Sequence, residues 1–557
     1  MDRPTPSALR AFSTRFAARL LLCSALVASP VAAQTDRDRL SERAFEGAQW
    51  VLATQAARAV AQVGARAAVG NGPLAEKIRT RQGIEDALDR QRRMLAKAIA
   101  ASGDTAAISA STVRLTNRLD QLDSEIRAEF PRYAEFASPR PLGYGALQDL
   151  LDQDEALVLF LSDRTATYVW AISKTGTAWH RAPLSSRQLG QLVRRVRRDL
   201  DPTGPSRAAV PLSAPSGPRI APFDADAAYQ LYTDLLAPVM DTLAGASHVY
   251  VVKDGALASL PLSVLLTSPA PNEMDAKDLR AADWLLNAFA LTTLPAVSSL
   301  SSIRNTPPRA PRPPRFAGFG NPRFAAVSAP PLQAASRAIN SFFDAGGTNL
   351  DAIRALAPLP GTARELRKIA GLFPANAVTL SLGAKATEAA VKSTDLSGTS
   401  IISFATHGLI TGDISGLAEP ALAFTPPDTA SDIDDGLLTA SEASTLDLDA
   451  DWVILSACNT AAGDGTPGAE GLSGLARAFL FAGARSILVS HWPVRDDVAA
   501  TLTADTLRRL NENSALRRSQ ALQQAIQDVT QNGADPTLAH PSAWAPFVLV
   551  GDGGALY

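Results

Sequence analysis

Short apolar runs alternate with longer segments of helical periodicity throughout the region that begins at Arg315. The apolar runs are expected strands, at 315–319, 378–382, 400–405, 452–456, 486–490 and 547–550. The periodic segments are expected helices, at 363–373, 387–392, 472–481, 496–510 and 515–529. Such alternation predicts an α/β fold in which a mostly parallel sheet has helices on both faces. In such sheets a ligand site lies beyond the carboxyl ends of the strands.

The segment before this region carries three further apolar runs that indicate strands. They are 156–161, 167–172 and 249–252. Residues 307–314 read Pro-Pro-Arg-Ala-Pro-Arg-Pro-Pro, which is typical of an extended linker. We therefore expect the α/β domain to have an N-terminal part at 145–306 and a C-terminal part at 315–557.

Residues 34–138 are predicted to be helical, because apolar side chains recur there at helical spacing. The clearest stretches are 44–60, 74–99 and 112–130. The first alternates large side chains with many alanines, which suits the close helix pairing of a tetratricopeptide-type repeat. No second copy of this pattern is found, so a repeat solenoid is not demonstrated. The region is a candidate surface for a protein partner.

The N-terminus has the three parts of a secretory signal peptide. Four arginines precede the apolar run 20–27, and small residues at 31–33 precede Gln34. The apolar run is too short to span a bilayer, and no later run is long enough. We therefore expect residues 1–33 to be removed from an exported protein of bacterial type. The mature chain is expected in the periplasm or the medium, without a membrane span.

Removal of this segment would leave a mildly acidic chain with a single cysteine. The full sequence has a formal net charge of −2, and residues 1–33 hold four Arg and one Asp, so the charge becomes −5. This balance gives no reason to expect nucleic-acid binding. Of the two cysteines, Cys23 lies in the predicted signal, so Cys458 remains without a disulfide partner in the chain.

Two of the apolar runs end in reactive side chains. The run 401–405 is followed by Thr406 and His407, and the run 453–457 is followed by Cys458. Neighbouring parallel strands would bring the two side chains together at one edge of the sheet. An imidazole beside a thiol lowers the pKa of the thiol and later protonates the leaving amine. The pair is therefore a candidate catalytic dyad, although Cys458 alone would be read as an inert buried thiol.

Gly408 directly follows the candidate histidine. Because glycine has no side chain, its backbone N–H can approach a substrate carbonyl closely. Together with the backbone N–H of Cys458 it is a candidate oxyanion hole, in which one donor is typically worth roughly 3 kcal/mol.

Four sequence blocks together resemble the CHAT domain, a caspase-like peptidase domain usually found behind tetratricopeptide repeats. The blocks are LPGTARELRKIA, FATHG, WVILSACNTAAGDG and EGLSGLARAFLFAGARSILVSHWPVRDD. The resemblance extends over about 145–557 and is strongest over 355–500. It implies a caspase-like fold, His407 and Cys458 as the dyad, and cleavage of a protein substrate through a thioester. It implies no metal or organic cofactor.

One position departs from the pattern of that family, which more often has an apolar residue where this chain has His491. The departure raises the question of a second imidazole near the edge of the sheet. Packing beside Trp492 is the interpretation we favour for His491. The sequence also offers no Cys/His spacing that would hold zinc.

Acidic residues follow both members of the predicted dyad in the sequence. Asp413, Asp464 and Glu470 could acidify the pocket for the residue before the scissile bond, which would favour Lys or Arg there. A solvated acidic loop explains the same residues equally well. The sequence 463–468 formally matches G-x-G-x-x-G, but Asp464 would repel a pyrophosphate and the connection is too long for a dinucleotide turn.

The residues therefore favour a cysteine endopeptidase in which Cys458 is the nucleophile and His407 the acid and base. A catalytically inactive scaffold that binds proteins through the helical N-terminal region is the main alternative. An acyl or thiol transferase that uses the same cysteine is a third.

Overall fold

The computed structural model describes most of the chain beyond the N-terminal region. The described ranges are 39–52, helical positions within 76–94, 106–129, 141–201, 221–305 without 272, 313–324, 350–409, 419–456 without 432, and 474–555. The predicted signal peptide and most of the proline-rich stretch lie outside them. None of the helices in the described part of the chain combines the length and apolar character that a membrane crossing requires.

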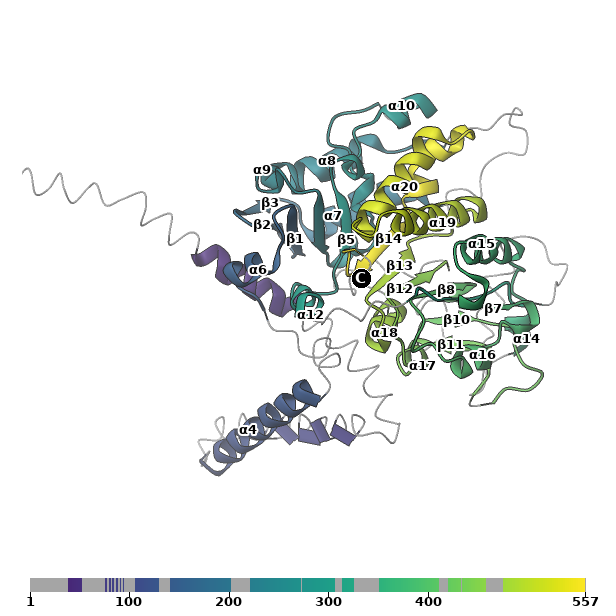
Figure 1. The fold of residues 1–557 in the computed structure, drawn as a ribbon. Coiled ribbons are helices and arrows are strands. Elements are labelled where there is room, and N and C mark those ends of the chain that lie inside the picture. The colour runs from purple at the N-terminus through teal and green to yellow at the C-terminus, as the bar shows by residue number, and fades with distance from the viewer. Residues whose placement is uncertain are drawn as a thin grey trace, which may run out of the picture.

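One eleven-stranded sheet organises the molecule (Figure 1). From edge to edge its strands are β3 (Thr177–Ala182), β2 (Thr167–Ser173), β1 (Glu155–Ser162), β4 (His248–Val252), β5 (Ala290–Thr293), β14 (Phe547–Gly551), β13 (Ser486–Ser490), β12 (Trp452–Leu455), β8 (Ile401–Ala405), β6 (Phe316–Gly320) and β7 (Val378–Leu382). Strands β1, β4 and β5 are parallel, and so are β13, β12, β8, β6 and β7. Antiparallel pairs join β3, β2 and β1 at one edge and β13 to β14 near the middle. The predicted mostly parallel sheet is confirmed.

Helices cover both faces of the sheet. Successive side chains of a strand point to opposite sides, so a strand that is apolar throughout needs cover on both faces. In β8, Ile401 and Ala405 join one apolar cluster, and Ile402 and Phe404 join another. The first face carries α7 (Ser186–Leu200), α8 (Ala225–Leu235), α15 (Pro360–Ala370), α19 (Asp496–Glu512) and α20 (Arg518–Asn532). The opposite face carries α6 (Tyr144–Leu150), α12 (Ser299–Asn305), α16 (Glu388–Ser393), α17 (Ala440–Ala443) and α18 (Gly474–Ala482). The shorter helices are α9 (Met240–Leu243), α10 (Ala276–Ala281), α11 (Leu285–Ala288), α14 (Leu350–Arg354) and α21 (Pro541–Trp544).

The expected elements after 315 agree with the structure within a few residues. Strands β7 and β13 have the predicted bounds, whereas α15 begins at Pro360 rather than 363 and α20 at Arg518 rather than 515. The sequence analysis missed β3, β5 and a separate sheet. That small sheet has the order β11-β10-β9, formed by β11 (Leu437–Thr439), β10 (Ala421–Ala423) and β9 (His407–Leu409).

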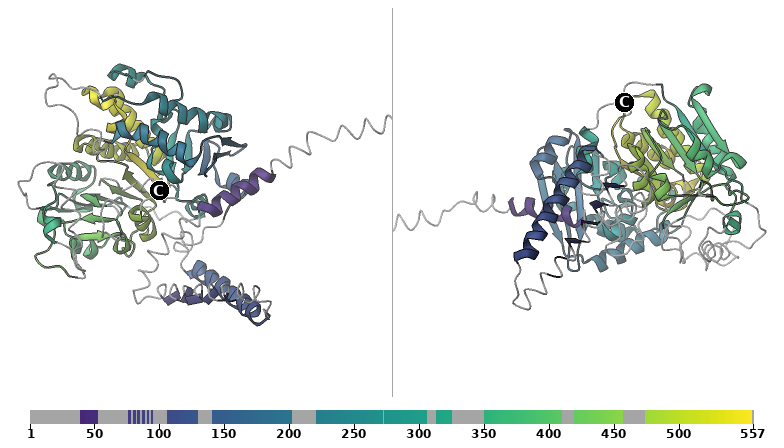
Figure 2. Two further views of the ribbon diagram at one scale, coloured as in Figure 1. Left: turned by 180° about the vertical axis from the view of Figure 1, so that it is seen from behind. Right: turned by 90° about the horizontal axis from the view of Figure 1, so that it is seen from below.

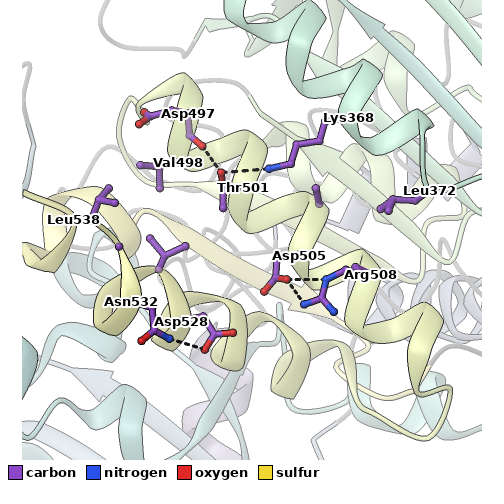
Figure 3. Close-up of a pocket in the computed structure, with 13 residues that line it drawn as sticks. Lys368, Leu372, Asp497, Val498, Thr501, Asp505, Arg508, Asp528, Asn532 and Leu538 are labelled. Carbon is purple, nitrogen blue, oxygen red and sulfur yellow. Dashed lines mark hydrogen bonds and ion pairs between the residues drawn. The ribbon is translucent and has the colours of Figure 1, made fainter. Parts of the chain in front are cut away.

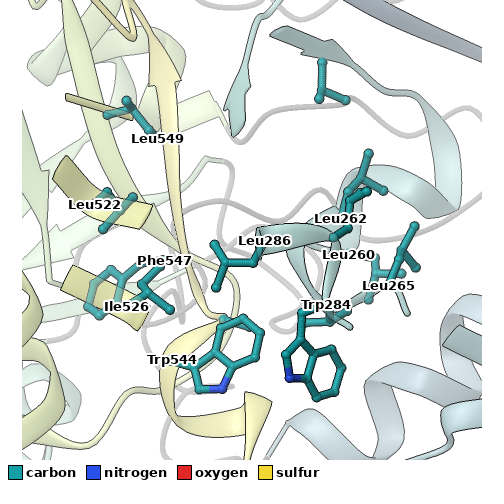
Figure 4. Packing of buried hydrophobic residues seen from close by; sticks show 14 of the residues in the cluster. Leu260, Leu262, Leu265, Trp284, Leu286, Leu522, Ile526, Trp544, Phe547 and Leu549 are labelled. Carbon is teal, nitrogen blue, oxygen red and sulfur yellow. The ribbon is translucent and has the colours of Figure 1, made fainter. Parts of the chain in front are cut away.

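The C-terminal elements pack against the N-terminal part of the domain. Strand β14 joins β5 through the pair Val550 and Thr293. Trp544 meets Trp284 edge to face, with ring centroids 5.6 Å apart, in a layer that also contains Leu286 (Figure 4). Seen from behind and from below, the yellow C-terminal elements lie between the teal and green parts (Figure 2). One sheet thus runs through both predicted parts, and the boundary between them stays a prediction.

Two helical pieces precede the α/β domain. Helix 39–52 places Phe45 against Trp170 of β2, with ring centroids 6.3 Å apart. Helix α4 (Ala106–Glu129) is joined by ion pairs to helical residues within 76–94. The predicted helical character is confirmed for these described residues, with α4 starting earlier than 112. Whether the region forms tetratricopeptide-type pairs stays a prediction.

Candidate active site

Strands β8 and β12, which precede the two predicted reactive residues, end side by side in the sheet. They are parallel neighbours in which Leu455 lies beside Phe404. The Ser456 amide continues this ladder by donating to the Phe404 carbonyl at 3.0 Å. The chain after β8 reaches His407 two residues beyond Ala405. His407 thus lies just beyond the carboxyl end of a central strand, as the sequence predicts.

His407 is also the first residue of a second, smaller sheet, which the sequence analysis did not foresee. In β9 it pairs with Ala423 of β10, and Gly408 pairs with Leu422. The hydroxyl of Thr406 donates to the Ala423 carbonyl and ties the corner between the two sheets. The backbone at His407 is therefore fixed by two sheets at once. The predicted oxyanion role of Gly408 stays a prediction.

A backbone carbonyl orients the His407 imidazole. The ring Nε2 lies 2.8 Å from the carbonyl oxygen of Ala357, which precedes helix α15. A carbonyl oxygen can only accept, so Nε2 must carry the proton in this hydrogen bond. In the neutral ring Nδ1 is then the basic nitrogen. The residues before α15 thus select the tautomer of His407.

Burial adjusts the basicity of the same ring. Phe324, which follows β6 and is itself buried, lies against His407 with ring centroids 5.5 Å apart. Burial lowers the pKa of His407 below its ordinary value of 6.5, and the hydrogen bond to Ala357 opposes this shift only in part. His407 is consequently neutral at pH 7, the state in which an imidazole accepts a proton.

A buried carboxylate meets the strand that leads to the predicted nucleophile. The Ser456 hydroxyl donates to Oε1 of Glu365 on α15 at 2.5 Å. Sequence reasoning missed Ala357, Phe324 and Glu365 as members of the site. Glu365 lies in the LPGTARELRKIA block, which was the one available signal. Ala357 and Phe324 lie far from His407 in the sequence, so no local pattern reveals their contacts with it.

The other predicted site residues lie outside the described residues. They are the nucleophile Cys458 and the acidic residues Asp413, Asp464 and Glu470. The structure therefore places one member of the dyad and the strand that precedes the other. Within the described ranges, no three metal-ligating side chains of His, Cys, Asp or Glu gather in one place.

His491 follows β13 and is buried beside Trp492, with ring centroids 6.3 Å apart, as the favoured interpretation expects. Burial lowers its pKa well below the ordinary value, and the positive charges of Lys253 and Arg197 add to this effect. A histidine that is so strongly held in the neutral form belongs to the core rather than to a second acid–base pair.

A groove of about 560 Å³ lies on the outer surface of α15, α19 and α20 (Figure 3). Its charged residues have partners: Arg508 pairs with Asp505, and Lys368 reaches the Thr501 hydroxyl at 3.4 Å. Asp497 and Asp528 pair with arginines outside the groove. Neither His407 nor Ser456 lines this groove. It therefore does not include the described residues of the predicted site.

A family model described as the CHAT domain matches residues 225–552 of the chain. Tetratricopeptide repeat protein 28 of Mus musculus is 28% identical over 364 residues, covering 58% of this chain and 13% of that protein. The Homo sapiens protein of the same name is 37% identical over 115 residues, covering 21% of this chain and 4% of that protein. The chain thus spans only a small part of the length of these relatives.

Two solved structures are distantly similar to the chain. The separase–securin complex of Saccharomyces cerevisiae gives a TM-score of 0.40 at 10% identity, covering 80% of this chain and 34% of the other. The Arg-specific cysteine proteinase gingipain R gives a TM-score of 0.33 at 11% identity, covering 60% and 67%. These likenesses are too distant for the role of any residue to be carried over.

Proposed function

The chain belongs to the CHAT domain family, and from this membership we propose that it is a caspase-like cysteine endopeptidase. The observation that carries the proposal is the orientation of His407. Its Nε2 is held by the Ala357 carbonyl, and its pKa is lowered by burial, so Nδ1 is available as a base.

Chain connectivity supports Cys458 as the partner of this base. Ser456 is bonded to the Phe404 carbonyl on the strand that leads to His407. Cys458 follows Ser456 by two residues, and two residues span at most about 7 Å. The nucleophile is therefore tethered close to the strand end from which His407 emerges.

The proposed reaction has two halves with one acyl-enzyme between them. The Cys458 sulfur attacks the scissile carbonyl carbon, and the thiol proton passes to Nδ1 of His407. When the C–N bond breaks, Nδ1 returns that proton to the leaving amine and a thioester remains. Water then attacks the thioester, giving one proton to Nδ1, which passes it to the departing sulfur.

The backbone N–H groups of Gly408 and Cys458 are the proposed donors to the oxyanion in both halves. Asp413, Asp464 and Glu470 are proposed to favour Lys or Arg in the residue before the scissile bond. No metal or organic cofactor enters the proposed reaction.

Export belongs to the same proposal. The arginine-rich start, the apolar run 20–27 and the small residues at 31–33 are its support. A protease released into the periplasm or medium would act on proteins outside the cytoplasm. Mass spectrometry of the protein from each culture fraction tests export. Export with removal of residues 1–33 should give a chain lighter than the full sequence, in the periplasm or the medium.

The experiment that tests the activity is a search for new protein N-termini. Wild-type protein, Cys458→Ala and His407→Ala are each added to a bacterial extract, with His180→Ala on the edge strand β3 as the matched histidine control. We expect new N-termini, with Lys or Arg before them, from the wild type and from His180→Ala only. The same N-termini from Cys458→Ala would refute the proposal.

A scaffold is the second candidate, and the names of the relatives favour it. Both matched relatives are called tetratricopeptide repeat proteins, and such repeats are protein-binding modules. In that case the helical N-terminal region would bind a protein partner and the dyad would be silent. Partner capture that persists in Cys458→Ala, together with an absence of new N-termini from the wild type, would favour the scaffold.

A further inference from the structure

A short segment before and within α15 touches the ends of three neighbouring strands. The Ala357 carbonyl accepts from His407, beyond β8. The Thr362 hydroxyl accepts from the Asn321 amide, beyond β6, at 2.9 Å. Glu365 accepts from Ser456, beyond β12, at 2.5 Å. We call residues 357–365 the brace, because this one segment links the carboxyl ends of β6, β8 and β12.

The brace is packed directly on the sheet. A side chain at Gly320, the last residue of β6, would lie 2.7 Å from the Ala405 carbonyl and 2.7 Å from Leu366 of α15. Leu366 is fully buried, and Glu365 is 2% exposed. Helix α15 therefore packs closely on the ends of β6 and β8, and the Glu365 side chain is enclosed in that contact.

The contact between Glu365 and Ser456 is a short hydrogen bond. The two oxygens are 2.5 Å apart, at the short end of the range for an O–H···O hydrogen bond. Ser456 is also bonded through its amide to Phe404, so its backbone and its side chain are both held. Cys458 follows two residues later, and its distance from His407 depends on where Ser456 is fixed.

We propose that Glu365 is a positioning residue for the nucleophile: through Ser456 it holds the start of the Cys458 segment beside His407. The inference rests on the proposed function, because it assumes that Cys458 and His407 act together. It gives a role to the LPGTARELRKIA block, which otherwise contributes the Thr362 hydroxyl that accepts from Asn321. The brace then positions base and nucleophile from one rigid segment.

The pH profile of Cys458 alkylation by iodoacetamide tests this inference in the full chain. Peptide mass spectrometry separates Cys458 from Cys23, and the experiment needs no protein substrate. A thiol beside an imidazole reacts well below its usual pKa of about 8.5. In the wild type we expect the inflection to lie below that value and to move up to it in His407→Ala.

Two variants remove the contact and two keep it. Ser456→Ala loses the donor and Glu365→Met loses the acceptor. We expect both to raise the inflection toward about 8.5 and to slow alkylation at pH 7 about tenfold. Ser456→Thr keeps a hydroxyl and Glu365→Gln keeps an acceptor oxygen, so both should stay within about threefold of the wild type. Thr362→Val, which removes the hydrogen bonds of the hydroxyl to Asn321 and to the Leu359 carbonyl but leaves Glu365 and Ser456 unchanged, is the matched control on the same helix and should keep the wild-type profile.

The outcomes separate the inference from the function on which it rests. If Ser456→Ala and Glu365→Met keep the wild-type profile while His407→Ala shifts it, Glu365 does not position the nucleophile and the dyad stands. If His407→Ala also keeps the profile, the dyad is refuted and the inference is refuted with it. Should Glu365→Met fail to fold, Ser456→Ala decides alone, because it removes one hydroxyl and no packing.

Discussion

At the scale of single residues, the environment of His407 determines which proton transfers it can make. A carbonyl fixes the proton on Nε2, and the Phe324 ring shields the imidazole from water. These two neighbours act in opposite directions on the pKa, and burial has the larger effect. His407 is therefore neutral at pH 7, and its ring can accept a proton without first losing one.

Replacing Phe324 with Ala should raise the pKa of His407 toward 6.5. Water would reach the ring and stabilise the imidazolium that burial now disfavours. A pH titration of the histidine Cε1–H signals by NMR measures this shift, with His407→Ala assigning the resonance. Phe373→Ala, which removes a ring that stacks on Phe316 instead, should leave that pKa unchanged. A fall in the pKa of His407 in Phe324→Ala would contradict the account.

Sequence reasoning could find His407 and Cys458 because each follows an apolar strand, and strand ends are where such sheets hold their sites. It could not find Phe324 or Ala357. Each is far from His407 in the sequence, and the contact forms only when the segments after β6 and before α15 fold over the end of β8. The structure describes His407 and Gly408, while Cys458 and the three acidic residues stay predictions.

At the scale of elements, the strands of the sheet that are continuous apolar runs could be predicted and two others could not. Buried strands of this kind show directly in a sequence. Strand β3 lies at an edge and alternates exposed and covered residues, and β5 reads Ala-Leu-Thr-Thr, in which only the first two residues are apolar. Helix α15 begins at Pro360, three residues before its predicted start, because proline is favoured in the first turn of a helix.

The contact between α15 and the sheet gives a prediction for Gly320. A Cβ there would lie 2.7 Å from the Ala405 carbonyl, a backbone atom that cannot swing aside. Gly320→Ala should therefore lower the free energy of unfolding by about 1–3 kcal/mol, measured by denaturant titration. At Gly145 in α6 an added Cβ meets nothing within 4 Å, so Gly145→Ala should be neutral or stabilising by up to about 1 kcal/mol. Equal effects of the two substitutions would contradict the packing described.

At the scale of the whole molecule, three histidines whose pKa is lowered by burial make stability depend on pH. They are His248, His407 and His491, and burial lowers the pKa of each below 6.5. The unfolded chain takes up protons at these sites below pH 6.5, whereas the folded chain does not. Their contribution to stability is thus complete above pH 6.5 and is lost as the pH falls through their folded pKa values.

We therefore expect the denaturation midpoint to fall between pH 7.5 and about 5.5. Each histidine contributes at most about 1.4 kcal/mol per pH unit. Asp254 and Glu388, whose pKa values burial raises to about 6 and about 8, oppose the loss with one proton each. His491→Leu should flatten the dependence, because it removes the histidine that lies nearest the charges of Lys253 and Arg197. A midpoint that does not change over this range, or an equally steep fall in His491→Leu, would argue against the buried histidines as its cause.

The continuity of the sheet could not have been read from the sequence either. The proline-rich stretch 307–314 suggests two separate parts, yet β14 returns from the C-terminal part to pair with β5. Pairing between strands so far apart in the sequence leaves no local signal. The apolar contact of Trp544 with Trp284 also joins distant segments and leaves no local signal in the sequence.

The central claim is that Cys458 is acylated with the help of His407. A peptide that carries an electrophile in place of the scissile bond, with Arg before it, tests this most directly, and mass spectrometry locates the label. The account predicts a label on Cys458 of the wild type, none in Cys458→Ala, and labelling slowed about a hundredfold in His407→Ala. Equal labelling of the wild type and Cys458→Ala, or a rate that does not depend on His407, would contradict it.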